Sequence, residues 1–169
     1  MSAAFRVLGI DASLRSTGLA VVESKGSSLS LVATDTARIS QARPRSECLG
    51  TLHQSISSLI HEASPTVAAI EACFYSKNAR TAELLGEARG TAIAVCAAQR
   101  LDVYEYVPRR VKQAVVGYGT ADKTQVRKMV MTLLGLVDEP QEDVGDALAI
   151  AICHIHSRST HDALMSEPI

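Results

Sequence analysis

The sequence lacks three features, each of which would have placed it in a distinct class of protein. It has no apolar run near the roughly 18 residues that a membrane-spanning helix needs. It has no charge excess of the kind that marks a disordered tail, because 17 Lys and Arg stand against 18 Asp and Glu. Its four cysteines include no Cys-x-x-Cys pair that would indicate a zinc or redox site. We therefore expect a soluble cytoplasmic chain with reduced thiols, no leader and no contact with a membrane.

The length and the apolar content indicate a single globular domain. A chain of 169 residues with 47% hydrophobic residues is large enough to bury a sizeable core. No repeat or linker divides it. We assign one domain to residues 1–157 and expect residues 158–169, which show no periodicity, to form a disordered tail.

Charge is concentrated in two neighbouring segments of opposite sign. Residues 109–128 carry six basic residues and one acid, and residues 138–146 carry five acids and no base. A charged run is usually only a solvated surface. Two adjoining segments of opposite charge are also what a metal-dependent enzyme needs when its substrate is a polyanion, because carboxylates hold cations while Lys and Arg bind phosphates. The charge pattern alone leaves both interpretations open.

Hydrophobic periodicity predicts strands and helices in alternation. Short apolar runs predict strands over residues 5–10, 18–23, 29–34, 67–70 and 102–107. Apolar residues at helical spacing predict helices from about residue 49 to the Ser64-Pro65 stop and over 78–100, 108–115, 121–134 and 142–156. Thr120 is the expected N-cap of the fourth helix. This order of elements indicates an α/β fold with a mixed five-stranded sheet flanked by helices.

Four acidic residues stand where the predicted structure alone does not require them. Asp11 and Glu71 each end a buried-type strand, and Asp143 and Asp146 share one face of the otherwise apolar last helix. A carboxylate that faces a core is normally paired or bound to a metal. Four such groups could hold two divalent cations that support phosphodiester hydrolysis. Taken singly, Asp11 is also compatible with a turn and Asp143 with a helix N-terminus.

Basic, aromatic and small residues near these acids fit the same chemistry. Lys112 and Lys123 could contact phosphates, and Phe74 could stack on an unpaired base. Phe74 is equally compatible with a place in the core. Small residues recur at every fourth position across 82–90, which favours close packing with another helix, either within the chain or in a second subunit.

The order of several short motifs resembles the RuvC family of bacterial Holliday-junction resolvases over nearly the whole chain. The first motif is Leu8-Gly-Ile-Asp11 with Ser16-Thr-Gly18, and the second is Ile70-Glu71 followed by Phe74, Lys77-Asn78 and Gly86-Glu-Ala-Arg-Gly90. The third is Val111-Lys-Gln113 with Val116-Gly-Tyr-Gly119, Lys123 and Gln125-Val126, and the fourth is Asp143-Val-Gly-Asp-Ala-Leu-Ala-Ile-Ala151. Each motif is weak by itself, but their order and spacing together are specific.

The resemblance implies an RNase H-like fold and an endonuclease that nicks two opposed strands of a four-way DNA junction in recombination and repair. It implies a homodimer that packs through the helix at 78–100, two Mg²⁺ ions per subunit with Mn²⁺ as a substitute, and RuvA and RuvB as partners. The metal ligands and catalytic acids of the family correspond to Asp11, Glu71, Asp143 and Asp146, and its catalytic lysine corresponds to Lys123. The candidate DNA-binding residues are Phe74, Lys77, Arg80, Arg109, Arg110, Lys112 and Lys123.

One departure from the family pattern and three other functions remain open. The family commonly has Pro-Gly after the first aspartate, where this chain has Ala12-Ser13, so the turn beside the metal site is expected to differ. One rival is a nuclease of the same fold that acts on RNA or on other branched DNA, and another is a junction-binding module without catalysis. The third is an actin-like or sugar-kinase-like nucleotide binder, but such folds usually have two domains.

Overall fold

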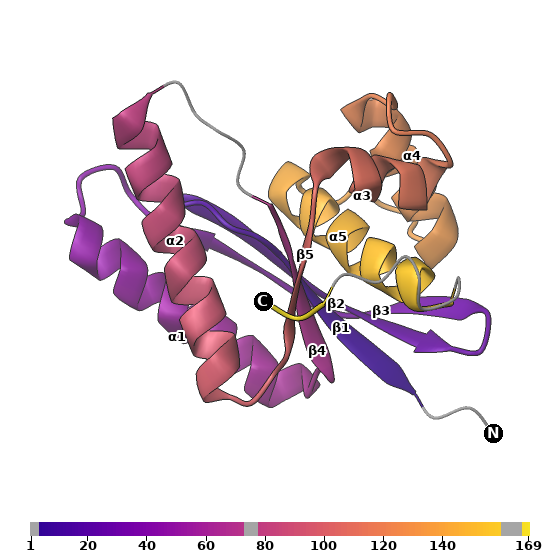
Figure 1. Ribbon diagram of the computed structural model, residues 1–169, viewed down its shortest axis with the longest axis horizontal. Helices are drawn as coiled ribbons and strands as arrows, with labels where there is room; N and C mark the ends of the chain where they lie inside the picture. Colours follow the sequence, from indigo (N-terminus) through magenta and orange to yellow (C-terminus); the bar gives the residue numbers. More distant parts are fainter. Residues whose placement is uncertain (1–3, 73–77, 160–166) are drawn as a thin grey trace.

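The protein, seen here as a computed structural model that describes residues 4–72, 78–159 and 167–169, is built around a mixed five-stranded sheet (Figure 1). The elements in chain order are β1 (Phe5–Asp11), β2 (Ser16–Lys25), β3 (Ser28–Arg38), α1 (Arg45–Ala63), β4 (Val67–Glu71), α2 (Ala79–Ala98), β5 (Val103–Tyr106), α3 (Pro108–Val116), α4 (Lys123–Leu134) and α5 (Glu142–Ser159). Helices α1 and α2 cover one face of the sheet, and α3, α4 and α5 lie on the other (Figure 1). The expected fold class is confirmed.

The strands lie in the order β3-β2-β1-β4-β5. β1 pairs antiparallel with β2 and parallel with β4, so it forms the centre of the sheet. β2 and β3 both extend beyond the predicted ranges, because their ladder continues from Ser16 opposite Arg38 to Lys25 opposite Ser28. Hydropathy misses these ends because polar residues form the same backbone hydrogen bonds as apolar ones.

Alternation along the strands divides the interior into two cores. In β1, Leu8 and Ile10 are buried with α1 and α2, whereas Val7 is buried with α5. Successive side chains of a strand point to opposite faces, so Gly9 and Asp11 share the α5 face with Val7. The same alternation assigns Glu71 to the α5 face of β4.

Two glycines allow α5 to lie directly against the sheet. A Cβ added at Gly9 would come within 1.9 Å of the backbone oxygen of Ala147, and one at Gly18 would come equally close to that of Asp143. Any larger residue at either position would push the helix backbone away. Because Gly9 and Gly18 have no side chain, α5 lies close to the sheet. This close packing also sets how far the acids on α5 lie from the strands.

Several helix ends differ from the sequence prediction, and α1 begins at Arg45 rather than near residue 49. α4 begins at Lys123, because Asp122 rather than Thr120 is its N-cap: Asp122 Oδ1 accepts from the Gln125 N–H while the Gln125 side chain accepts from the Asp122 N–H. This reciprocal capping box satisfies two helix-terminal donors, which a lone Thr cannot do. α5 continues to Ser159, past the boundary expected at residue 157. At the end of the chain, the Ile169 N–H donates to the Val103 carbonyl at 2.9 Å.

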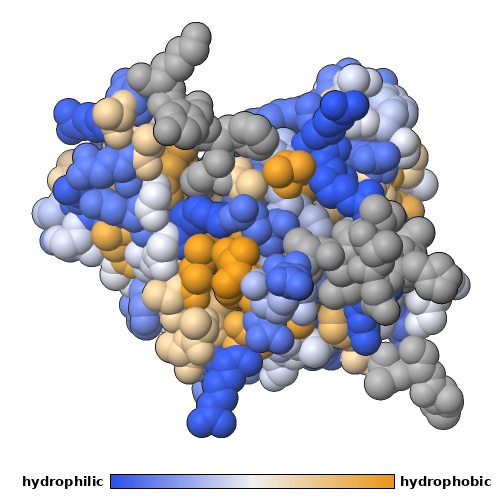
Figure 2. All heavy atoms as spheres, viewed as in Figure 1, coloured by the Kyte–Doolittle hydropathy of each residue, from blue (hydrophilic) through white to orange (hydrophobic). Residues whose placement is uncertain are grey.

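The surface seen in Figure 2 is mostly hydrophilic, with a small apolar area near the centre of that face. Within residues 4–72, 78–159 and 167–169, no helix is long and apolar enough to cross a membrane. Cys48, Cys96 and Cys153 are free thiols in the interior, and burial raises the pKa of both Cys96 and Cys153 to about 12.

Candidate active site

The fold brings the four predicted acids together at one end of the α5 face of the sheet. Asp11 and Glu71 end two adjacent parallel strands, whose carboxyl ends meet at the same edge. Asp143 and Asp146 lie on the first turns of α5, which packs across these strands. Three segments of the chain that are 60 or more positions apart in the sequence thus contribute to one acidic cluster.

The acids interact strongly with one another. The pKa of Asp11 is raised to about 7, first by burial and then by the negative charges of Asp146, Glu71 and Asp143. The pKa of Glu71 is also raised, by burial first and then by Asp146, while Lys123 and Lys112 oppose this effect. Excess negative charge in a half-buried site favours the binding of cations.

Lys123 reaches this cluster from the first residue of α4. Its Nζ lies 2.9 Å from a carboxylate oxygen of Glu142 and 3.2 Å from one of Asp146. The hydrogen bond to Glu142 is the main reason that the pKa of Lys123 is raised above its ordinary value. The two charged segments seen in the sequence therefore partly neutralise each other, and Arg127 adds a third ion pair between them, with Glu139 at 2.7 Å.

Two residues to which the sequence analysis gave no role, Ser16 and Arg89, form hydrogen bonds with the acids. The Ser16 hydroxyl donates to Oδ2 of Asp143. Arg89 of α2 donates to the backbone carbonyl of Glu71 at 2.8 Å and pairs with Glu105. Arg89 belongs to a motif quoted above, but nothing in the sequence indicates that it reaches the end of β4.

The turn after Asp11 is closed by side-chain hydrogen bonds. Ser13 Oγ donates to the Ser16 carbonyl at 2.7 Å and accepts from the Ser16 N–H at 3.2 Å. The Ser13 N–H in turn donates to Thr17 Oγ1 at 3.1 Å, and the Thr17 hydroxyl donates back to the Ser13 carbonyl. Ser13, at the position where the resemblance led us to expect glycine, thus supplies side-chain contacts that a glycine could not make.

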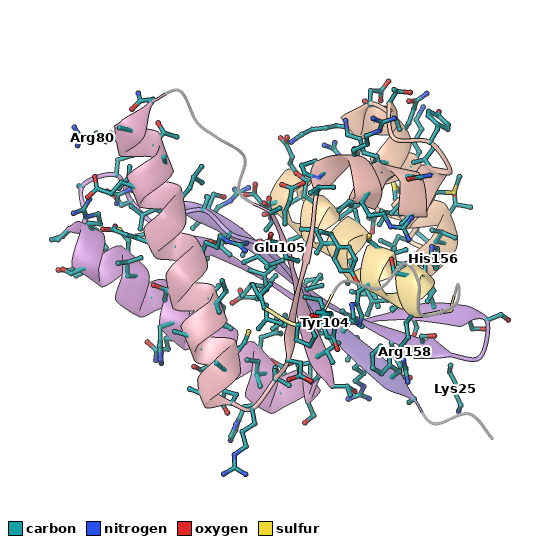
Figure 3. All side chains as sticks on the ribbon, viewed as in Figure 1. Lys25, Arg80, Tyr104, Glu105, His156 and Arg158 are labelled. Atoms are coloured by element: carbon teal, nitrogen blue, oxygen red, sulfur yellow. The ribbon has the colours of Figure 1, made fainter. Side chains whose placement is uncertain are left out.

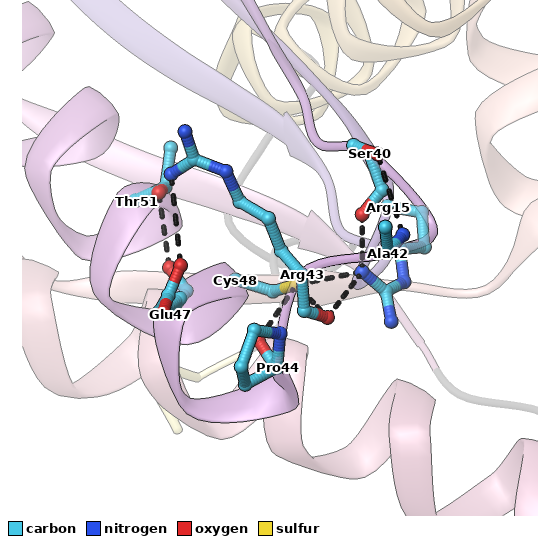
Figure 4. A network of polar contacts seen from close by, with 8 residues as sticks. All are labelled: Arg15, Ser40, Ala42, Arg43, Pro44, Glu47, Cys48 and Thr51. Atoms are coloured by element: carbon cyan, nitrogen blue, oxygen red, sulfur yellow. Dashed lines mark hydrogen bonds and ion pairs between the residues drawn. The ribbon is translucent and has the colours of Figure 1, made fainter.

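Arg15 ties this turn to the start of α1 (Figure 4). Its guanidinium donates to the carbonyls of Ser40 and Arg43 at 2.7 and 3.1 Å, and it lies 2.9 Å from the sulfur of Cys48. The loop between β3 and α1 is thereby fixed against the turn that follows Asp11. Hydrogen bonds from a charged donor are stronger than those from a neutral one.

The acidic cluster fits divalent cations in its chemistry. Its donors are carboxylate oxygens, the ligands that Mg²⁺ prefers, and their mutual repulsion would be relieved by bound positive charge. Across residues 4–72, 78–159 and 167–169, no three Asp, Glu, His or Cys side chains already converge closely enough to hold one ion. Lys123 donates to Oδ2 of Asp146 and Ser16 donates to Oδ2 of Asp143, and each of these carboxylates has a second oxygen that can coordinate a cation.

The predicted DNA-binding residues lie in different environments. Lys112 lines a cavity of about 280 Å³ together with Glu71, Lys123 and Asp146. Arg110 instead donates to Ser157 at 3.0 Å, which is 11 residues or about 16 Å along α5 from Asp146.

Arg109 and Arg80 do not line this cavity. The side chain of Arg109 packs against Gly119. Arg80 projects from the first turn of α2 (Figure 3), where it lines a groove with Arg15 and Arg45. Phe74 and Lys77 fall outside the described residues.

Comparison with known proteins identifies the family. The family model described as crossover junction endodeoxyribonuclease RuvC matches residues 7–154. The chain belongs to the RuvC family. A RuvC from Caldicellulosiruptor saccharolyticus is 46% identical over 157 residues, covering 92% of this chain and 95% of its own, and one from Burkholderia ambifaria is 45% identical over 159 residues, covering 94% and 86%.

Solved structures agree with this assignment. Thermus thermophilus RuvC in complex with a Holliday junction substrate matches with a TM-score of 0.91 and 31% identity, over 98% of this chain and 99% of that one. The yeast mitochondrial Holliday junction resolvase Ydc2 matches with a TM-score of 0.67 at 14% identity, over 90% and 78%, which shows the shared fold alone. The fold is thus RNase H-like, as the resemblance implied, and RuvC proteins are metal-dependent nucleases.

Proposed function

We propose that this RuvC protein resolves four-way DNA junctions by nicking two opposed strands symmetrically, in homologous recombination and DNA repair. The observation that carries the proposal is the convergence of Asp11, Glu71, Asp143 and Asp146 on one face of the sheet, with Lys123 in contact with Asp146. Family membership adds that its relatives are crossover junction endodeoxyribonucleases. Nothing in these comparisons supports a nuclease for RNA or for other branched DNA.

We assign the four acids as ligands of two Mg²⁺ ions per subunit, which Mn²⁺ can replace. When bound, the ions supply the positive charge that activates water and stabilises the leaving oxygen of a phosphodiester. Asp11 interacts electrostatically with all three other acids and would help to hold the ions. Lys123 holds a positive charge at the edge of the cluster and offsets the charge that develops on the phosphate.

Basic residues around the cluster guide the junction into it. Lys112 shares the cavity of the acids and contacts the phosphate nearest to the cut. We assign weaker and more distant phosphate contacts to Arg80, Arg109 and Arg110. Phe74 and Lys77, which follow β4 in the sequence, complete the proposed DNA surface, with Phe74 stacking on an unpaired base.

A four-way junction has approximate two-fold symmetry, so two identical sites are needed to cut it in pairs. We propose a homodimer that packs through the helix at 78–100. Gly86 and Gly90 of α2 are exposed, and a Cβ at either would meet nothing within 4 Å, so the backbone of a second helix can approach there. The proposed nuclease domain spans residues 1–157 and the proposed tail residues 158–169, with α5 continuing two residues into the tail, to Ser159. RuvA and RuvB are the proposed partners in the cytoplasm.

The decisive experiment uses the purified protein with an end-labelled four-way junction and a linear duplex of the same sequence, each with Mg²⁺ or EDTA. We expect paired nicks at symmetric positions on the junction alone, only with Mg²⁺, and products that ligase reseals. Equal cutting of both substrates, or failure to bind the junction, would contradict the proposal.

An Asp146→Asn variant separates the enzyme from a junction-binding module. It removes the negative charge of one proposed ligand, which is also one of the two carboxylates paired with Lys123, while keeping the shape of the side chain. We expect it to bind the junction and leave it uncut. If the unchanged protein bound junctions without nicking them under any divalent cation, the module would be the better description.

A further inference from the structure

We propose that Ser16 is a positioning residue of the acidic cluster, whose hydroxyl fixes the Asp143 carboxylate in the orientation that binds a divalent cation. The contact on which this rests is the hydrogen bond from Ser16 Oγ to Asp143 Oδ2, between residues 127 positions apart. The inference depends on the proposed function, because it concerns the same cation site.

The strand register places Ser16 where it can act on Asp143. In β2, Ala20 and Val22 are buried on the α5 face, and alternation puts Gly18 and Ser16 on that face as well. Gly18 touches the backbone of Asp143, so Ser16, the next residue on this face, lies beside the side chain of the same residue. Gly18 also pairs with Asp11, so Ser16 lies beyond the end of β1, next to the acidic cluster.

The turn before β2 holds Ser16 in place from both sides. Its N–H and its carbonyl are both bound by Ser13 Oγ, and its position in the ladder is opposite Arg38. The backbone of Ser16 is therefore fixed independently of its side chain. Truncating that side chain removes the contact with Asp143 and leaves the turn intact.

The expected role follows from the chemistry of the carboxylate. The contact uses Oδ2, and a carboxylate has a second oxygen that can coordinate a cation. A ligand whose rotamer is already fixed loses less entropy when the ion binds, and a hydrogen bond limits the repulsion from the neighbouring acids. Partners that hold metal ligands in this way typically contribute about 10- to 100-fold in metal affinity.

The test compares three variants of the full-length protein, without DNA. Ser16→Ala removes the hydroxyl, Ser16→Thr keeps it, and Ser30→Ala on the exposed part of β3 is the matched control. Binding of Mn²⁺ is measured by electron paramagnetic resonance of the free ion, and urea unfolding is followed in EDTA. We expect Ser16→Ala to weaken Mn²⁺ binding about tenfold, Ser16→Thr to restore it, and the metal-free unfolding midpoints to match that of the control.

Three results would overturn the inference. Wild-type affinity in Ser16→Ala would show that the contact is irrelevant to the cation. Equal losses in Ser16→Ala and Ser16→Thr would assign the effect to side-chain volume rather than to the hydroxyl. A metal-free midpoint of Ser16→Ala far below the control would show a damaged fold. If the unchanged protein bound no Mn²⁺ and cut no junction, the proposed function would fail instead.

Discussion

Gly18 offers the most direct test of the geometry that assembles the acidic site. A Cβ at this position would lie 1.9 Å from the backbone oxygen of Asp143, 2.2 Å from its carbonyl carbon and 2.8 Å from the nitrogen of Val144. All three are backbone atoms, so no side-chain rotation relieves the clash. Restoring ordinary van der Waals contact in a Gly18→Ala variant requires the first turn of α5 to move away by about 1.5 Å.

This displacement should affect activity more than stability. Overpacking of a core costs about 1–3 kcal/mol in the free energy of unfolding. A shift of about 1 Å in a catalytic group can cost about 100-fold in rate, and here Asp143 itself moves with the turn. We therefore expect Gly18→Ala to remain folded, with a lower urea midpoint, and to nick four-way junctions at least tenfold and up to about 100-fold more slowly under single-turnover conditions.

A Gly50→Ala variant is the matched control. Gly50 lies on an exposed position of α1, where an added Cβ meets nothing within 4 Å. Ala is favoured over Gly in a helix by about 1 kcal/mol, so this variant should be slightly more stable and nick at the normal rate. A Gly18→Ala protein with the wild-type urea midpoint and nicking rate would refute the close approach of α5 to β2.

Three further predictions concern other parts of the molecule. His154 is buried beside Tyr106, and burial lowers its pKa from 6.5 to about 4. Its contribution to the free energy of unfolding is therefore fully present above pH 6.5 and falls by about 3 kcal/mol as the pH drops through 4. A His154→Gln variant should lose this part of the pH dependence in urea unfolding, and an unchanged pH profile would contradict the prediction. Arg15→Met should lower the free energy of unfolding by about 1.5–3 kcal/mol, because it removes charged hydrogen bonds to two carbonyls; a loss near zero in urea unfolding would show that water replaces them. Lys123→Met should abolish nicking, and it should reduce the slope of log binding constant against log salt concentration by about 1, the effect of one lost phosphate contact. A variant that still nicks would remove Lys123 from the mechanism.

Local sequence was enough to identify the acids and most of the elements. A strand that ends on Asp11 and a helix that carries Asp143 and Asp146 on one face are visible in the hydrophobic pattern, because alternation and helical spacing are properties of neighbouring residues. The exceptions were ends of elements. The start of α4 depends on the capping box of Asp122, and the length of β3 depends on its ladder with β2, neither of which hydropathy detects.

The sequence by itself therefore determined the order of the elements and the family, and it supplied the four candidate acids. Only the tertiary structure decided how the acids are held. The contacts of Ser16 with Asp143, Arg89 with Glu71 and Lys123 with Asp146 join residues 127, 18 and 23 positions apart. Such contacts arise from strand register and from the close packing of α5 on two glycines, and these are set by the whole core rather than by any local segment.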